Sequence, residues 1–528
     1  MNNLNFKQQL DSRVDLQHLL FRRGFVVSKK EFSMDIFPFY GNWKVENVNG
    51  YYFMTHRDIH CFHIEKNNVT YFLLGHSYNP FTMEFDEVKQ LEQIADAYEK
   101  GKDCYWKAVD ELTGIFVMGY FDAKQISFIT DPSGMQSAYY GQVQDNFMIT
   151  SHPQIIGDLY DLPMDDFVKE LVNYKWYNRV KGCYLPGDLS AFKEVKRIVP
   201  NIEFTYCNGT VASHRFYPLK DLTECKSIDE YNDVIEKAAT ILKNNAELVL
   251  KKWNCPAISL TGGIDSNTTF AAANGHYTEY ETFSYLSAHK ETIDVEAAKK
   301  IASRFKTKHT IYEIPVNNLN IQDFELKEAI LNHNSGYIAP RRKENEIRKR
   351  IYLEEHCNND VEVKSWVSET IRAYWYKHYG RKSFPKLSPK LYRNLYKIFI
   401  TNRSLAHKID KVFAEYINKY EVSKIPVQYP STDIYYNEVA LGSWGGTNIT
   451  EMKYCFDITT LYNNRIFLDL MFRVPFEKRL KDQHHLDMKK YLNKELYNMN
   501  IRVGNMEETK TRAFFLNIIF TLNSLLPF

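Results

Sequence analysis

The chain has 528 residues, which is too long for one hydrophobic core and predicts roughly two to four domains. Hydrophobic residues at 44% and charged residues at 25% are ordinary globular values, and a formal net charge of +2 gives no electrostatic case for binding nucleic acid or an anionic membrane. The eight cysteines lie far apart without a C-x-x-C pair, so neither a zinc site nor a redox pair is predicted.

Two features favour a cytoplasmic protein. Scattered free thiols suit a reducing compartment. The first residues, MNNLNFKQQLDSRVD, contain no apolar stretch that would act as a secretory signal. The most apolar run, residues 513–528, is too short to span a bilayer and is interrupted by Asn and Thr.

The chain up to about Pro218 is rich in strand patterns. β-Branched and aromatic runs alternate with short polar turns, which predicts a layered antiparallel β domain. The runs are 51–64, 69–75, 114–122, 125–131 and 138–152. One amphipathic helix is expected from Glu87, ending near Gly101.

After about residue 220 the pattern changes to helices that alternate with short apolar strands. Such alternation predicts a parallel sheet with helices on its faces. The expected strands are 256–261, 280–286, 309–315 and 360–367. From about Gly380 the chain has a mostly helical pattern without repeats. The predicted domains are therefore 1–218 and 225–528.

The stretch CPAISLTGGIDSNTTFAAANG, residues 255–275, combines a strand, a turn and a helix. Residues 256–260 have the pattern of a buried strand, and 266–274 that of a helix with Gly275 as its C-cap. A helix that leaves a glycine turn directly after a strand points unpaired N–H groups at the turn. This arrangement is typical of a phosphate cradle.

The residues of the turn agree with an anion site. Gly262 and Gly263 lack Cβ atoms that would keep a ligand away from the backbone, and Thr261 and Ser266 add hydroxyl donors. Asp265 would repel a phosphate unless it held a divalent cation, so Mg²⁺ is predicted together with the nucleotide. The alternative is a plain tight turn, in which Asp265 only caps the helix and favours its dipole.

The order Thr-Gly-Gly-Ile-Asp-Ser in this turn resembles the pyrophosphate loop of the N-type ATP pyrophosphatases, usually Ser-Gly-Gly-x-Asp-Ser, which cleave ATP between the α and β phosphates. More widely, the chain resembles the asparagine synthetase family, with its β-lactam synthetases and lasso-peptide cyclases. Residues 111–140 have the order of that family's amidotransferase-like domain, with Asp131 and Gly134 in its turn.

The resemblance implies a fold and a set of nucleotide-binding residues. The implied fold is an α+β N-terminal β-sandwich with helices, like that of the Ntn hydrolases, followed by an α/β parallel-sheet ATP pyrophosphatase domain with a helical C-terminal part. Leu260 and Tyr285 fall where family members place backbone contacts to adenine, at strand carboxyl ends. The implied ATP and pyrophosphate site consists of Ser259, Leu260, Thr261, Gly262, Gly263, Asp265, Ser266 and Tyr285.

One departure from the family concerns glutamine. Glutamine-hydrolysing members need a cysteine as the mature N-terminal residue, because its α-amine is the base for its thiol. Here Met1 is followed by Asn2, and no cysteine occurs before Cys61. The resemblance therefore implies a member without its own glutaminase, for which the nitrogen comes from ammonia or from an amine.

A second departure concerns the family's acidic turn, S-G-x-G-x-D-E, which holds magnesium pyrophosphate. This chain has VKSWVSETIRAYW at 363–375, where Glu369 aligns with the Glu and Ser368 stands in place of the Asp. Asp265 and Glu369 are the predicted Mg²⁺ ligands, and Glu369 and Arg372 are the candidates for a changed catalytic arrangement. The alternative is that Glu369 is only a first-turn acid of a helix.

Lys510, in NMEETKTRAFF, matches the lysine that the family brings over the reaction centre. With Glu369 and Arg372 it completes the predicted catalytic set. The alternative is a lysine on a solvated helical face.

Together these features predict an ATP-dependent ligase that adenylates a carboxylate, releases AMP and pyrophosphate, and forms an amide with an amine or ammonia. The cofactors are ATP and Mg²⁺. The partners are small-molecule or peptide carboxylates and amines, without nucleic acid or membrane, and a homodimer is an option. The alternatives are an asparagine synthetase that uses free ammonia and a nucleotide-binding pseudoenzyme with a regulatory or assembly role.

Overall fold

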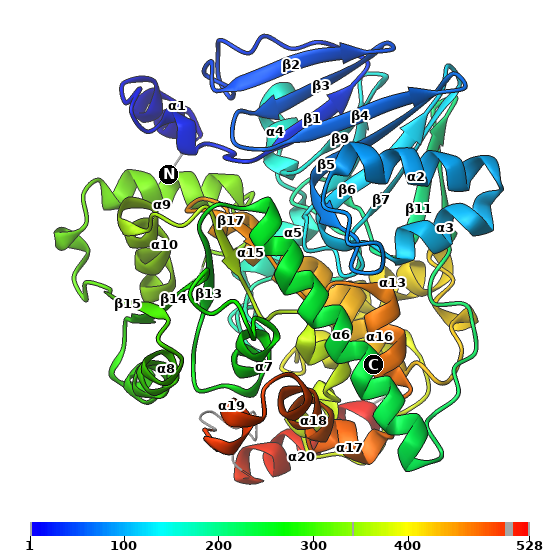
Figure 1. Ribbon diagram of the computed structural model, residues 1–528. Helices are drawn as coiled ribbons and strands as arrows, with labels where there is room; N and C mark the ends of the chain where they lie inside the picture. Colours follow the sequence, from blue (N-terminus) through cyan, green and yellow to red (C-terminus); the bar gives the residue numbers. More distant parts are fainter. Residues whose placement is uncertain (1–2, 341–342, 502–509, 526–528) are drawn as a thin grey trace.

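The computed structural model describes residues 3–340, 343–501 and 510–525 (Figure 1). Three sheets and their covering helices account for most of it. The strands of the first two sheets fall within residues 25–215, and those of the third lie between residues 256 and 459. In the described ranges, no helix is long and apolar enough to cross a bilayer.

The first two sheets are antiparallel, which confirms the predicted layered β region. The first has the order β10-β8-β9-β1-β3-β2, and the second β12-β11-β7-β6-β5-β4. The first sheet consists of β1 (Phe25–Ser28), β2 (Trp43–Val48), β3 (Tyr51–His56), β8 (Tyr139–Val143), β9 (Asn146–Thr150) and β10 (Val195–Arg197). The second consists of β4 (Cys61–Lys66), β5 (Val69–Tyr78), β6 (Thr113–Phe121), β7 (Gln125–Thr130), β11 (Ile202–Cys207) and β12 (Thr210–Arg215).

Aromatic side chains fill the space between these two sheets. The rings of Phe147 on β9 and Tyr206 on β11 stack at 4.0 Å, and those of Tyr51 on β3 and Phe121 on β6 lie 4.7 Å apart. The helices α2 (Glu87–Glu99) and α3 (Lys102–Asp110) pack on the second sheet, and α4 (Pro153–Tyr160) packs on β8 and β9. The high aromatic content therefore serves the core between the sheets.

The third sheet has five parallel strands in the order β15-β14-β13-β16-β17, so the predicted parallel sheet is confirmed. Its strands are β13 (Pro256–Ser259), β14 (Glu281–Leu286), β15 (Lys308–Glu313), β16 (Val361–Val363) and β17 (Asp457–Thr459). β16 is shorter than the expected strand 360–367: it ends at Val363, and the chain then turns at Val367, whose φ is 77°.

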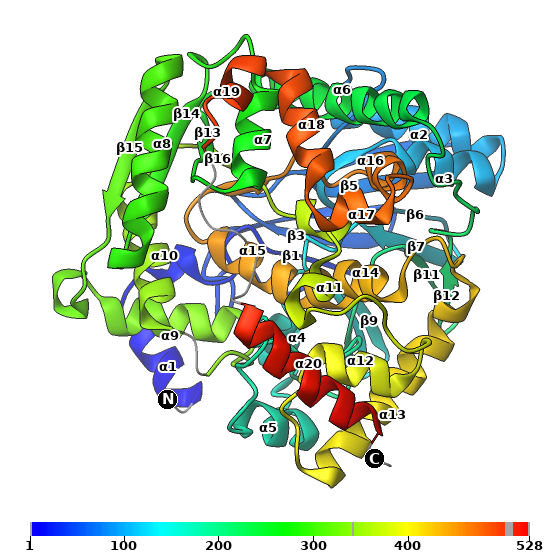
Figure 2. The same cartoon turned by 90° about the horizontal axis from the view of Figure 1, so that it is seen from below.

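Helices cover this sheet. α6 (Ile228–Lys252), α7 (Ile264–Ala272) and α18 (Gln483–Leu492) pack against one another, and α8 (Thr292–Phe305) covers β14 and β15 (Figures 1 and 2). α7 begins two residues before the expected helix and ends at Ala272, so Gly275 lies beyond its C-cap. Strand, turn and helix follow in the predicted order.

The last third of the chain is mostly helical, as predicted, apart from β17. Its helices are α11 (Tyr374–Tyr379), α12 (Pro389–Tyr396), α13 (Arg403–Lys419), α14 (Ser431–Tyr435), α15 (Gly446–Met452), α16 (Arg465–Phe472), α17 (Phe476–Leu480), α18, α19 (Lys494–Asn498) and α20 (Lys510–Leu525), with a π-helical segment at Tyr436–Gly445. The remaining α-helices are α1 (Asn3–Asp11), α5 (Asp166–Asn173), α9 (Phe324–Asn334) and α10 (Glu344–His356).

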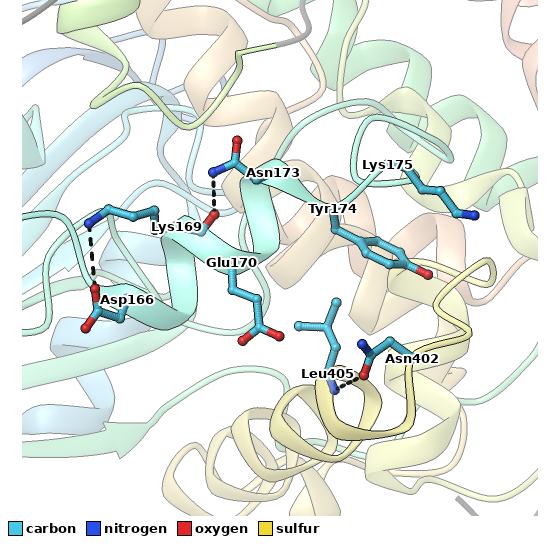
Figure 3. Close-up of a pocket in the computed structure, with 8 residues that line it drawn as sticks. All are labelled: Asp166, Lys169, Glu170, Asn173, Tyr174, Lys175, Asn402 and Leu405. Carbon is cyan, nitrogen blue, oxygen red and sulfur yellow. Dashed lines mark hydrogen bonds and ion pairs between the residues drawn. The ribbon is translucent and has the colours of Figure 1, made fainter.

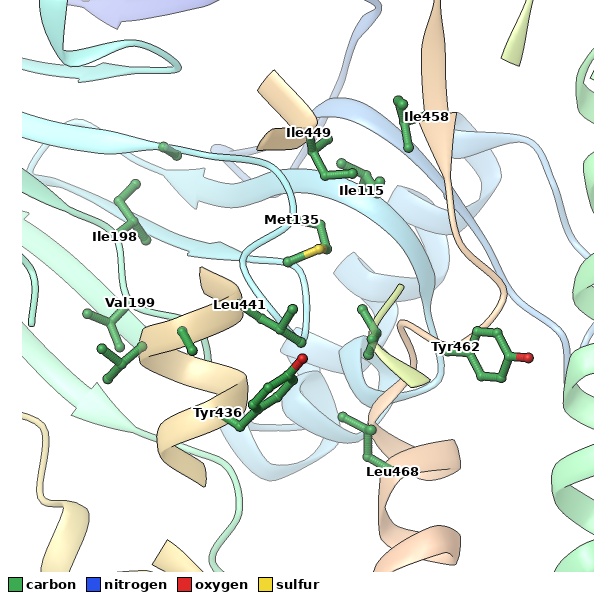
Figure 4. Close-up of a cluster of buried hydrophobic side chains, with 14 of the residues drawn as sticks. Ile115, Met135, Ile198, Val199, Tyr436, Leu441, Ile449, Ile458, Tyr462 and Leu468 are labelled. Carbon is green, nitrogen blue, oxygen red and sulfur yellow. The ribbon is translucent and has the colours of Figure 1, made fainter. Parts of the chain in front are cut away.

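The β-rich region and the parallel-sheet region share a buried boundary. Arg215 on β12 forms a bidentate ion pair with Glu438 of the π-helical segment at 2.6 and 2.9 Å, and both side chains are at most 1% exposed. Met135 of the β-rich region and Leu441 and Ile449 of the helical region also belong to one apolar cluster (Figure 4). The core is therefore continuous across the predicted boundary near residue 220, whose position stays a prediction.

Candidate functional site

The glycine turn lies at the carboxyl end of β13, the central strand of the parallel sheet. Ser259 is the last residue of the strand, and Leu260 is fully buried, with its N–H donated to Phe283 O at 2.9 Å. Ser284 Oγ donates to Leu260 O at 2.6 Å. These bonds fix the start of the turn at the edge where open parallel sheets bind ligands.

Within the turn, the hydroxyls of Thr261 and Ser266 are hydrogen-bonded to each other at 2.8 Å. Gly263 is the N-cap of α7 with a φ of −69°, which any residue adopts, so glycine serves here to leave space rather than to permit the conformation. The N–H of Gly262 is donated to the carboxylate of Asp294 at 3.1 Å. The N–H of Gly262, at the start of α7, therefore already donates to a carboxylate of the same chain, that of Asp294.

Tyr285 lies near the carboxyl end of β14, the strand next to β13 in the sheet. The ammonium of Lys349, from α10, lies 4.2 Å from the centre of the Tyr285 ring, and Lys349 is ion-paired with Glu291 at 2.9 Å. Burial raises the pKa of the Tyr285 hydroxyl above its ordinary range. Its contact with adenine stays a prediction.

The segment after β16 reaches the glycine turn from the neighbouring strand. Ser368 Oγ donates to Asp265 Oδ1 at 2.7 Å, and the Arg372 guanidinium forms an ion pair with Asp265 Oδ2. Val367 and Ala373 flank this short turn with φ of 77° and 51°. Left-handed backbone at a β-branched residue is strained, and such strain concentrates at functional sites.

Arg372 is held on its other side by Asp482. Its Nε and Nη2 each donate to one Asp482 oxygen at 2.8 Å, and Lys377 Nζ adds a bond to Asp482 at 2.6 Å. Only 3% of the Arg372 side chain is exposed. Burial opposes its charge, but the carboxylates of Asp265 and Asp482 raise the pKa of Arg372 above its ordinary value. The guanidinium is therefore fixed and charged.

Glu369 lies in the same turn, and its Oε2 atom is buried without a hydrogen-bond partner among the described residues. Burial raises the pKa of this carboxyl, and the negative charge of Asp265 raises it further. The structure thus brings Asp265, Glu369 and Arg372 together, as the sequence predicted for these three residues, and adds Ser368 and Asp482. Their catalytic roles stay a prediction.

The arrangement does not fit the Mg²⁺ site predicted from Asp265 and Glu369. Both carboxylate oxygens of Asp265 are engaged, one by Ser368 and the other by Arg372. Ser368 provides a hydroxyl at the position where the asparagine synthetase family, which this segment resembles, has a carboxylate. Across the described ranges, no three His, Cys, Asp or Glu side chains form a group that would hold a metal ion. A buried guanidinium stands where a cation would neutralise Asp265.

Lys181 is a candidate that the sequence analysis missed. Its ammonium lies 4.0, 4.6 and 4.9 Å from the ring centres of Tyr374, Tyr436 and Trp444 and donates to the Tyr436 hydroxyl at 2.8 Å. Burial lowers the pKa of Lys181 to about 8, against the opposing effect of Glu369. No sequence signal marks it, because its partners arrive from distant segments.

Lys181 lines a cavity of about 400 Å³. One wall is Trp366, which follows β16 and stacks on Trp444 at 5.2 Å. The lining residues are Asn178, Lys181, Gly182, Cys183, Ala339, Lys343, Glu346, Arg350, Trp366, Trp444, Thr447, Asn448 and Glu451. Since Trp366 lies two residues before Ser368, this cavity adjoins the turn that contacts Asp265.

Another hollow lies between α5 and α13 (Figure 3). Some of its polar side chains bond within their own segment: Asn173 Nδ2 donates to Lys169 O at 2.9 Å, and Asn402 Oδ1 accepts from the N–H of Leu405 at 3.0 Å. None of its lining residues belongs to the group around Asp265. This hollow is therefore separate from the site around Asp265.

Lys510, the third predicted catalytic residue, is exposed at the first position of α20. α20 packs against α11, whose first residue follows Arg372 by two positions (Figure 2). No contact within the described ranges joins Lys510 to Asp265, Glu369 or Arg372. Its role stays a prediction.

The fold and this site define a chain in which two antiparallel sheets precede a parallel sheet with a glycine turn at its carboxyl edge. Residues 256–330 match the family model described as asparagine synthase. Asparagine synthetase [glutamine-hydrolyzing] 3 of Bacillus subtilis (strain 168) is 23% identical over 269 residues, which are 47% of this chain and 41% of that protein. The chain thus spans less than half of that relative. This match confirms the predicted resemblance to the asparagine synthetase family in the segment that contains the glycine turn.

Three solved structures match parts of this chain at low similarity. The first is a glutamine phosphoribosylpyrophosphate amidotransferase from B. subtilis with ADP and GMP, at 9% identity over 56% of this chain and 60% of that chain, with a TM-score of 0.23. The second is an allosteric regulatory enzyme of purine biosynthesis, at 10% identity over 64% of this chain and 83% of that chain, with a TM-score of 0.25. The third is a glutamine-dependent NAD⁺ synthetase from Acinetobacter baumannii with ADP, at 12% identity over 46% of this chain and 57% of that chain, with a TM-score of 0.15.

Proposed function

We propose that the protein is an ATP-dependent ligase that adenylates a carboxylate and joins it to an amine or to ammonia, releasing AMP and pyrophosphate. In this proposal the β-rich region is an Ntn-hydrolase-like scaffold, and the parallel-sheet region is an ATP pyrophosphatase domain. The observation that carries it is the turn Thr261–Ser266 at the carboxyl edge of the parallel sheet, within the segment that matches the asparagine synthase family.

The turn supplies what a leaving pyrophosphate needs. The first N–H groups of α7 have no partner within the helix, as at the start of any helix, and they point toward the turn. A preorganised donor of this kind contributes most where charge develops in the transition state. Arg372 adds a fixed positive charge beside Asp265. The Mg²⁺ expected with ATP has no part in this step, because Asp265 is already paired.

The cavity beside Lys181 is the proposed site of the carboxylate substrate. A positive charge among aromatic rings, without an ion pair to any described residue, suits a carboxylate that carries an apolar group. Removing an ammonium partly from water is costly, and lysines with a lowered pKa are characteristic of functional sites.

Lys181→Met is expected to make the fold more stable and the enzyme less active. The folded pKa of about 8 lies below the ordinary 10.5 of lysine, so protonation favours the unfolded chain. At pH 7 the variant should therefore unfold with a free energy about 1–3 kcal/mol larger than wild type, a gap that closes as the pH rises from about 8 to about 10.5. Urea titrations across this range measure it, and a variant less stable at pH 7 contradicts the assignment.

Glutamine is expected not to serve as the nitrogen donor. Burial raises the pKa of the Cys61 thiol in β4 to about 12, so this cysteine provides no thiolate at neutral pH. Incubation with glutamine, with and without ATP, should release no glutamate above the level of a boiled control. Stoichiometric release of glutamate would overturn this expectation.

Nucleotide products test the proposed function. With a set of candidate carboxylates and hydroxylamine as a general acceptor, wild type should form AMP and pyrophosphate in equal amounts. Asp265→Asn should lower that rate by about tenfold to a hundredfold, because it removes the carboxylate that ties Arg372 and Ser368 to the glycine turn. ADP and phosphate as products would refute adenylation, and tight ATP binding without any product would favour the pseudoenzyme. Aspartate and ammonia in the set test asparagine synthesis.

A further inference from the structure

The pairing of Asp265 with a guanidinium instead of a metal ion has a direct bearing on how the glycine turn binds its ligand. We propose that the turn Thr261–Ser266 binds the polyphosphate of a nucleotide without a divalent cation, and that the Arg372 guanidinium supplies the positive charge beside Asp265. This inference rests on the proposed function, since it concerns the same nucleotide site.

The position of Arg372 is fixed before any ligand arrives. Asp482 holds two of its nitrogen atoms at 2.8 Å each, and Lys377 supports Asp482 at 2.6 Å. Such two-point geometry between a guanidinium and a carboxylate fixes orientation as well as charge. The remaining Nη1 atom points at Asp265 Oδ2. The cation is therefore built into the protein instead of being recruited.

The charges around the turn balance without a metal. Arg372 and Lys377 offset Asp265 and Asp482, and all four belong to one chain of contacts. An incoming phosphate therefore does not meet an uncompensated Asp265 carboxylate, which is the problem that Mg²⁺ would otherwise solve.

A divalent ion would also have to displace part of this network. To join Asp265 to a phosphate, it would need an Asp265 oxygen that now accepts from Ser368 or Arg372. It would then lie beside a guanidinium that is 3% exposed and has no solvent to move into. Two positive charges at such close range repel each other strongly in a buried site.

The backbone supports the same arrangement. The left-handed residues Val367 and Ala373 enclose the 3₁₀ turn Ser368–Ile371 and direct both Ser368 and Arg372 at Asp265. Strain of this kind persists only where the surrounding structure holds it. The contact with Asp265 is therefore a built feature of this turn.

Isothermal titration of the full chain with α,β-methylene-ATP, in EDTA and in excess Mg²⁺, tests the inference. Wild type should bind with dissociation constants within about threefold of each other in the two buffers. Arg372→Ala should bind about tenfold to a hundredfold more weakly in EDTA, and Mg²⁺ should restore its affinity, because Asp265 is then free to hold a metal ion. Arg372→Lys keeps the charge and should bind in EDTA with intermediate affinity.

Arg381→Ala is the matched control, since Arg381 contacts Asn517 and Thr521 of α20 and none of the residues at the turn. It should bind like wild type in both buffers. If wild type binds only in Mg²⁺, the inference is wrong and the proposed function is unaffected. The same conclusion follows if Arg372→Ala binds in EDTA as tightly as wild type. No binding in either buffer overturns the proposed function, and the inference with it. The comparison of wild-type binding in EDTA and in Mg²⁺ needs no variant, so it tests the inference even if Arg372→Ala does not fold.

Discussion

Replacing Lys510 with alanine is expected to lower kcat for AMP formation by about a hundredfold to a thousandfold, with a much smaller change in KM for ATP. A donor that meets charge only in the transition state affects kcat in this way. The resemblance to the asparagine synthetase family implies that Lys510 lies over the reaction centre, which stays a prediction. The packing of α20 on α11 brings the helix that begins at Lys510 to the element that follows Arg372.

A lysine on a solvated surface would behave differently. Lys510 is exposed in the structure, and loss of an exposed lysine rarely changes a free energy by more than about 0.5 kcal/mol. Lys411→Ala, at an exposed position of α13, is the matched control and should keep normal turnover. If folded Lys510→Ala also turns over within about a factor of two of wild type, Lys510 has no role in catalysis, and Lys181 becomes the lysine to test.

Replacing Glu438 with glutamine is expected to lower the free energy of unfolding by about 3–5 kcal/mol. The substitution leaves the Arg215 guanidinium buried without its carboxylate, although Arg215 keeps its bonds to the carbonyls of Tyr217 and Tyr420 at 2.9 and 2.7 Å. An uncompensated buried charge at the boundary between the two regions costs far more than the loss of a surface ion pair.

Chemical denaturation of wild type and Glu438→Gln measures this loss. Asp233→Asn is the control, because the Asp233–Lys237 pair is more than half exposed on both sides. That variant should change the free energy of unfolding by less than about 1 kcal/mol. A loss below about 1 kcal/mol for Glu438→Gln as well would mean that Arg215 is hydrated or otherwise compensated.

The fold was predictable wherever the pattern along the chain is local. The strand, turn and helix at 256–272 follow from an apolar run, two glycines and a helix start, all within a few residues. β2 was missed because it is an edge strand with four of its six residues exposed, and the alternation of apolar and polar residues in its sequence, WKVENV, stops after Glu46. β17 was missed because three residues give too short a signal.

The site was predictable only in part. Asp265, Glu369 and Arg372 stood out because each lies within a motif or where a motif is altered. Asp482 and Lys181 did not, because tertiary packing brings them to the site from segments without any motif. The left-handed turn at Val367 was also hidden, since its sequence has none of the glycines that usually mark such a conformation.

The most direct measurement for the central claim is a crystal structure of the full chain with AMP and inorganic pyrophosphate. We expect pyrophosphate over the turn Thr261–Ser266, within hydrogen-bond distance of the first N–H groups of α7. We also expect Arg372 to stay paired with Asp265 and the AMP phosphate to face the cavity of Lys181. Pyrophosphate bound elsewhere on the protein, or no density for either ligand at saturating concentration, would contradict the central claim.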